Sequence, residues 1–172
     1  MKKLRGLLIC LLILTVCAGG VWLTLHLTAE YPALGEPVSY PVNQVPGFTL
    51  TLDEPSWSPF KGYSLRYDVA AESETVYTFT SYHSAGFEHL EQQADGQWRR
   101  LTVSPPPPEE FTDFAPLEFA LGGGESHGLG GSLVQKYAGY GTRLCPGLYR
   151  LVLEMTAPDG TPHYLAAEFS VD

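Results

Sequence analysis

Cysteine is scarce in this sequence, and its distribution excludes a disulfide framework. Three cysteines occur among 172 residues, and Cys10 and Cys17 both lie in an apolar N-terminal segment. Cys145 is therefore alone in the remainder, where no disulfide can form within one folded domain. Because no basic cluster lies beside it in sequence, we expect a buried or half-buried small apolar residue, with intermolecular pairing as the alternative to that role.

Basic side chains are also few outside the first residues. From Thr28 onward the sequence has seven lysines and arginines against 19 acidic residues, a net charge of −12. A surface with this excess of negative charge is expected to repel the phosphate backbone of nucleic acids and anionic lipid head groups. Nucleic acid is therefore excluded as a partner.

The N-terminal segment contains the one long uncharged run. Lys2, Lys3 and Arg5 precede 22 uncharged positions from Gly6 to Leu27, which as a helix would extend ~33 Å, enough for a bilayer core of ~30 Å. We predict a cytoplasmic basic tail over residues 1–5 and a transmembrane signal anchor over residues 6–27, with the remainder extracellular. A cleaved signal peptide and a lipoprotein linked through Cys17 are the alternatives, and each of them also exports the remainder.

The segment over residues 28–46 is rich in proline, with Pro32, Pro37, Pro41 and Pro46. Proline at this density disfavours helix and strand and favours an extended chain. We expect a Pro-rich linker that separates a folded domain from the membrane.

Period-two patterning begins at residue 48 and indicates β-strands. Apolar and polar residues alternate over residues 48–52 and 63–69, and runs rich in aromatic or aliphatic residues follow at 76–82, 117–121 and 128–134. Asp95-Gly96 predicts a hairpin over residues 87–103, because both central positions of a type I′ turn need positive φ. A closing hairpin joins residues 148–155 to 164–171. The expected fold of residues 47–172 is all-β, an antiparallel β-sandwich of about seven or eight strands.

Two groups of residues resemble chemical sites without meeting their requirements. Residues 124–128 match the G-x-S-x-G pattern of serine hydrolases, but the glycines that follow cannot begin the helix on which that motif depends. His83, Glu88, His89 and Glu91 are close in sequence, yet Glu88 and His89 would face opposite sides of a strand and the spacing fits no common zinc site. We predict no catalytic residue, no cofactor site and no metal site.

Aromatic residues have two interpretations. Trp57, Tyr82, Phe87 and Trp98 fill the core in the favoured interpretation and line a carbohydrate or peptide surface in the other. Tyr149 follows Pro146-Gly147 at the start of an apolar strand, the setting of a tyrosine corner, in which the hydroxyl bonds to nearby backbone.

Several short motifs together resemble a known family. They are Phe87, Leu90 and Glu91; Gly96 and Trp98; Gly124 to Ser126; and Leu144, Pro146, Gly147, Tyr149 and Arg150. In this respect the chain is similar to the bacterial immunoglobulin-like domains, small exported modules found mostly in Firmicutes. The resemblance covers residues ~47–157.

That resemblance implies an immunoglobulin-like sandwich without catalytic residues, in which Gly96, Trp98, Pro146, Gly147 and Tyr149 have structural roles. It implies a membrane-tethered extracellular module whose partner is a cell-surface protein or a wall polymer. A second family, the small immunoglobulin-like bacterial proteinase inhibitors, shares the Gly-Glu-Ser turn and the Pro-Gly-x-Tyr strand. By that resemblance, an exposed loop over residues 104–112 or 122–131 would enter a protease cleft.

Overall fold

The computed structural model describes residues 2–81, 88–103, 117–123 and 127–172. The chain forms two compact units, Met1–Glu30 and Tyr31–Asp172. The first contains helix α1 (Lys2–Leu27), whose described leucine, isoleucine and valine side chains are exposed. Among the residues described, no helix combines the length and the hydropathy that crossing a membrane requires.

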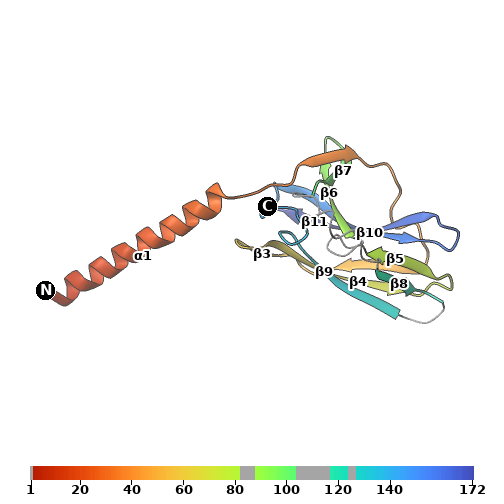
Figure 1. Ribbon diagram of the computed structural model, residues 1–172, viewed down its shortest axis with the longest axis horizontal. Helices are drawn as coiled ribbons and strands as arrows, with labels where there is room; N and C mark the ends of the chain where they lie inside the picture. The colour runs from red at the N-terminus through yellow and green to blue at the C-terminus, as the bar shows by residue number, and fades with distance from the viewer. Residues whose placement is uncertain (1, 82–87, 104–116, 124–126) are drawn as a thin grey trace. The chain divides into compact units, whose positions relative to one another are not determined.

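The second unit, called the sheet unit below, consists of β-strands (Figure 1). In chain order these are β1 (Leu34–Pro37), β2 (Phe48–Leu52), β3 (Ser56–Ser58), β4 (Gly62–Ala71), β5 (Tyr77–Ser81), β6 (Glu88–Ala94), β7 (Gln97–Leu101), β8 (Leu117–Leu121), β9 (His127–Val134), β10 (Gly147–Thr156) and β11 (Pro162–Val171).

The strands form two antiparallel sheets. The larger sheet has the order β1-β7-β6-β10-β5-β8, and β11 pairs with the other side of β10. The smaller sheet has β4 at its centre, with β2 and β3 on one side and β9 on the other. The prediction of an all-β fold with antiparallel strands is therefore confirmed.

One hydrophobic cluster takes side chains from both sheets. Alternate residues of β10, namely Tyr149, Leu151, Leu153 and Met155, are buried in it, as the period-two pattern predicted. In the smaller sheet, Tyr67 on β4 packs over Gly131 on β9, where a Cβ atom would collide with the phenol ring. Gly131 thus makes room for the ring of one core aromatic residue.

The proline-rich segment differs from the expected free linker. Residues 31–46, called the strap below, belong to the sheet unit, and they include β1, which pairs with β7. Pro37, the last residue of β1, does not prevent this pairing, because β1 lies at a sheet edge where a missing backbone donor is tolerated. Val45, near the end of the strap, enters the hydrophobic cluster.

Two expectations about side-chain burial are wrong. Cys145 is exposed, because it lies in the turn before β10 and not on a buried strand face. Trp57 is also exposed, on the short edge strand β3, so the core interpretation fails for this residue. Tyr82 and Phe87 lie outside the described residues.

Candidate functional site: a buried polar network under the strap

The strap is bonded to strands near both sides of the larger sheet. At one side, the amide of Val38 donates to the carbonyl of Trp98 (2.9 Å) and the amide of Thr102 donates to Ala33 (2.9 Å). At the other side, the amide of Asn43 donates to the carbonyl of Tyr164 on β11 (2.8 Å). The strap therefore crosses over β6 and β10 between these two attachments.

Asn43 makes the second attachment specific. Its side-chain nitrogen donates to the carbonyl of Ala166 (3.0 Å), and its side-chain oxygen accepts from the amide of the same residue (2.8 Å). The side chain thus pairs with the edge of β11 as a neighbouring strand would. Asn43 also has a φ of 56°, a left-handed conformation that asparagine tolerates better than most residues.

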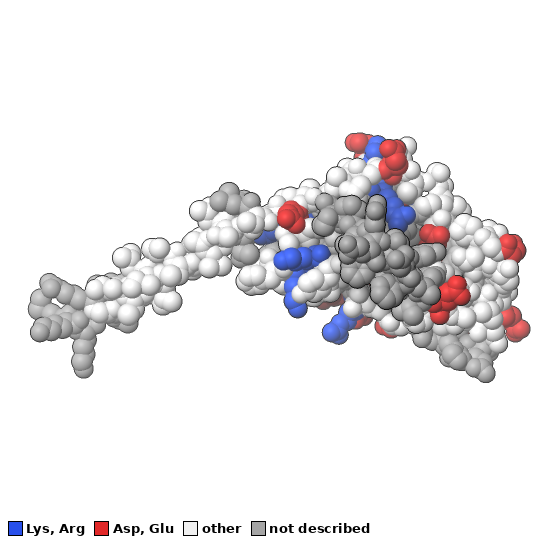
Figure 2. Space-filling model, viewed as in Figure 1, with Lys and Arg blue, Asp and Glu red and all other residues white. Residues whose placement is uncertain are grey.

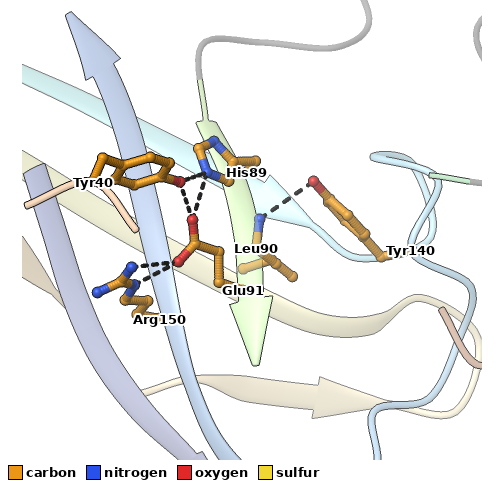
Figure 3. A network of polar contacts seen from close by, with 6 residues as sticks. All are labelled: Tyr40, His89, Leu90, Glu91, Tyr140 and Arg150. Carbon is orange, nitrogen blue, oxygen red and sulfur yellow. Dashed lines mark hydrogen bonds and ion pairs between the residues drawn. The ribbon is translucent and has the colours of Figure 1, made fainter. Parts of the chain in front are cut away.

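Between the two attachments the strap covers a network of buried polar side chains (Figure 3). Glu91 on β6 is fully buried and lies at its centre. One carboxylate oxygen accepts from Nε of Arg150 (2.7 Å) and lies 2.6 Å from its NH2 nitrogen. The other oxygen contacts Nε2 of His89 (3.0 Å) and accepts from the hydroxyl of Tyr40, the member contributed by the strap.

The contacts determine which nitrogen of His89 carries a proton. Tyr40 donates its one hydroxyl proton to Glu91, so its oxygen can only accept in the 2.8 Å contact with Nε2 of His89. Nε2 is therefore the donor to both Tyr40 and Glu91. Among the described residues, no buried side-chain nitrogen or oxygen lacks a hydrogen-bond partner, as the burial of polar groups requires.

Electrostatics keep the carboxylate ionised. Burial alone would raise the pKa of Glu91, but hydrogen bonds from His89, Tyr40 and Arg150, together with the positive charge of Arg150, outweigh burial and lower the pKa. Burial raises the pKa of Tyr40, and its hydrogen bond to Glu91 raises it further, so the phenol stays protonated. The network thus contains the ion pair of Glu91 and Arg150, with a protonated phenol, that of Tyr40, among its hydrogen-bond donors.

Aromatic rings enclose the network. The guanidinium carbon of Arg150 lies 4.4 Å from the centre of the Trp98 ring, a cation–π contact. The ring of Tyr40 stacks on that of Tyr164, with 3.8 Å between centroids. These rings restrict access of water and make the charged contacts stronger than they would be at an open surface.

A second tyrosine, Tyr140, also contacts β6. The hydroxyl of Tyr140 accepts from the amide of Leu90 (3.3 Å), whose side chain is in the core (Figure 3). Tyr140 follows β9, so this contact connects the loop before β10 to the middle of the larger sheet. It is separate from the network of Glu91.

The structural residues predicted from the sequence lie around this site. Asp95 and Gly96 both have positive φ in the turn between β6 and β7, as the hairpin prediction required. Trp98 is half-buried against Arg150. The hydroxyl of Tyr149 donates to the carbonyl of Cys145 (2.6 Å), across Pro146 and Gly147, which is the backbone contact expected of a tyrosine corner.

Sequence reasoning missed the central contacts of the network. The expected alternation of Glu88 and His89 between opposite faces is consistent with the structure, in which His89 and Glu91, two residues apart, share the face under the strap. Sequence reasoning treated Tyr40 and Asn43 as linker residues, and no local pattern in the sequence indicates their partners on β6 and β11. The available signal was weak: Arg150 interrupts a mostly apolar run, whereas Glu91 lies in a mostly polar one, and a charge on a buried strand face is usually paired.

The other candidates remain separate from this site. Within the described ranges, no group of three or more His, Cys, Asp or Glu residues is placed to hold a metal ion. Gly124 to Ser126, His83 and the loop over 104–112 lie outside the described residues. In the network itself the carboxylate is saturated with donors, so its arrangement suits attachment of the strap and not proton transfer to a substrate.

Comparisons with known proteins give little beyond this. No protein-family model matches the chain, and no curated protein matches it. A solved structure from Bordetella pertussis that carries the ApaA name is similar at a TM-score of 0.34 and 17% sequence identity, over 76% of this chain and 96% of that one. A likeness at that score carries no argument about fold or function.

Proposed function

We propose that the chain is a non-enzymatic module of the bacterial cell envelope, tethered to the membrane by α1 and exposed on the outside. Its sheet unit is an immunoglobulin-like β-sandwich with a binding or structural role toward a cell-surface protein or wall polymer. The attached strap is the observation that carries the proposal. It follows the candidate membrane segment in the chain, and the contact of Tyr40 with the buried network attaches it to the larger sheet.

Two features support the membrane part of the proposal. Lys2, Lys3 and Arg5 precede an uncharged run that continues to Leu27, the order of charges expected of a signal anchor. The large apolar side chains described in α1, such as Leu12 and Val16, are more than half exposed, at 67% and 68%. Apolar area of that extent in water is unfavourable, and a lipid environment would cover it.

The network supports the non-enzymatic part. Its charged groups are buried, paired and covered by aromatic rings, whereas a catalytic acid or base must reach its substrate. Its contacts attach the strap to the larger sheet.

Membrane fractionation tests the proposal. The full chain, expressed in a bacterial host, should remain in membranes after alkaline washing, and protease added to intact cells should degrade the sheet unit. Recovery of the intact N-terminus from the membrane fraction by N-terminal sequencing would exclude cleavage of the leader. Recovery of the chain in the soluble cytoplasmic fraction, protected from external protease, would contradict the proposal.

A further inference from the structure

Three exposed aromatic residues gather where two loops of the sheet unit meet. Trp57 on β3 and Phe60 in the turn between β3 and β4 are 42% and 63% exposed, and Tyr137 in the turn after β9 is 68% exposed. Isolated exposed apolar residues are ordinary, but a group of aromatics on adjacent turns indicates an interaction surface.

The two loops are held together by buried contacts. The amide of Lys136 donates to the carbonyl of Lys61 (3.1 Å), and the amide of Gln135 donates to Tyr63 (2.9 Å). The fully buried side chain of Gln135 accepts from the amide of Tyr63 (3.0 Å) and donates to the carbonyl of Tyr140 (2.9 Å). The exposed aromatics therefore lie on a fixed platform.

The charge of this platform is opposite to that of the rest of the sheet unit. Residues 55–63 and 135–147 contain Lys61, Lys136 and Arg143 and no acidic residue. Arg143 lies over the ring of Trp57, with its guanidinium carbon 4.5 Å from the ring centre. In the view of Figure 2, basic side chains lie on the part of the sheet unit near β3, with an acidic side chain beside them; other basic side chains lie near β7, and several acidic side chains lie toward the other end.

We infer that this aromatic–basic end, made of Trp57, Phe60, Lys61, Lys136, Tyr137 and Arg143, docks on a membrane surface rich in anionic lipid head groups. Lysine and arginine are attracted to such a surface, while tryptophan and tyrosine favour the head-group region and phenylalanine the acyl boundary. The inference rests on the proposed tether, which keeps a membrane close to the sheet unit at high effective concentration.

The overall negative charge does not oppose this docking. Charges are screened over ~8 Å at physiological ionic strength, so the nearby cations determine the interaction of a docked end. The acidic remainder of the sheet unit would be repelled by the same surface. Attraction at one end and repulsion elsewhere favour one orientation of the sheet unit.

Amide hydrogen exchange on the full chain tests this inference. The chain is incorporated into nanodiscs of phosphatidylcholine, with or without phosphatidylglycerol, and exchange is followed in residues 55–63 and 135–143. We expect exchange in these loops to slow only in anionic discs and to recover at high salt. Lys61→Glu should weaken docking roughly tenfold or more and so remove most of the slowing of exchange in anionic discs. Each basic residue near an anionic surface strengthens binding about fivefold, and this variant replaces one positive charge by a negative one.

Matched variants separate docking from general effects. Arg66→Glu reverses one exposed charge on β4, outside the two loops, and should leave the protection unchanged. Phe60→Ser should weaken it, whereas Val76→Ser, at another exposed apolar position, should not. Equal protection in neutral discs, no protection in anionic discs, or equal effects of Lys61→Glu and Arg66→Glu would overturn the inference.

Failure of the tether would be seen separately. If the chain does not enter neutral discs, the tether proposal fails, and flotation with lipid vesicles then tests docking alone. Flotation with anionic vesicles that Lys61→Glu abolishes would support docking without a tether. Absence of flotation with anionic vesicles, or binding only to a soluble acidic polymer such as polyphosphate, would overturn it.

Discussion

At the scale of single residues, the buried ion pair of Glu91 and Arg150 determines the properties of the face under the strap. Glu91 lies on the mostly polar strand β6 and Arg150 on the mostly apolar strand β10, and both side chains are removed from water. A buried charge is tolerated only when it is paired and its hydrogen bonds are satisfied. Arg150 contacts one carboxylate oxygen of Glu91, and Tyr40 and His89 supply the donors to the other oxygen.

Removal of Glu91 should be strongly destabilising, because Arg150 would remain buried without its counter-charge. We expect Glu91→Ala to lower the free energy of unfolding by about 3–5 kcal/mol, measured by denaturant unfolding at pH 7. Glu154→Ala, at an exposed position on β10, should change it by less than about 0.5 kcal/mol. Replacing Glu91 and Arg150 together by methionine should cost less than Glu91→Ala alone, and an equal or greater cost would contradict this view of the ion pair.

Acid should weaken the same contacts. The folded pKa of Glu91 is lowered below its usual value of 4.5, so its ionised form contributes stability above about pH 4.5. That contribution is lost as the pH falls below 4.5 and through the lower folded pKa. In denaturant unfolding from pH 7 to pH 3, the native chain should therefore lose more stability than Glu91→Gln, which cannot titrate at this position. Identical pH profiles would show that Glu91 is not coupled to folding.

At the scale of elements, the strap is the part of the fold that its sequence describes least well. Proline content indicated an extended chain, and the strap includes the strand β1, but its partners in the larger sheet are 49 or more residues away in the sequence. The strand β1 has four residues and no alternation. It pairs through backbone groups, which are the same for every residue type.

Asn43 should be the residue whose replacement loosens one attachment of the strap. Asn43→Ala removes two side-chain hydrogen bonds to β11 and places alanine at a positive φ, for an expected loss of about 1–3 kcal/mol in unfolding free energy. Limited proteolysis should then cut within residues 38–46 faster than in the native chain. Gln44→Ala is the control, since that exposed side chain donates to the nearby carbonyl of Val42 within the strap. Equal cleavage of both variants would contradict the attachment.

The strands with a buried face were predictable, and the reason is physical. Phe48–Leu52 and Tyr77–Ser81 lie within the runs expected from the pattern, and the Asp95-Gly96 turn joins β6 to β7 as expected. These elements have a local cause, either burial of one face or a turn that needs positive φ. The polar network has no local cause, because Tyr40, Glu91 and Arg150 are each 49 or more residues from their partners in the other strands.

At the scale of the whole molecule, the chain has one helical unit and one sheet unit, and the strap is the start of the second. The boundary between the units therefore falls at residues 30 and 31, before the prolines and not after them. If α1 is held in a membrane, residues 28–30 connect it to the sheet unit. The sheet unit would then stay close to the lipid surface, as docking through the aromatic–basic end requires.

The attachment of the strap is tested most directly by amide hydrogen exchange at residues 31–46 and at Thr102 of the full chain. We expect the amides of Val38, Asn43 and Thr102, which donate to the backbone, to exchange far more slowly than in an unstructured peptide. Tyr40→Phe should speed exchange at Val38 and Asn43 and leave β4 unchanged. Strap amides that exchange at the rate of an unstructured peptide while β6 and β10 stay protected would contradict the account.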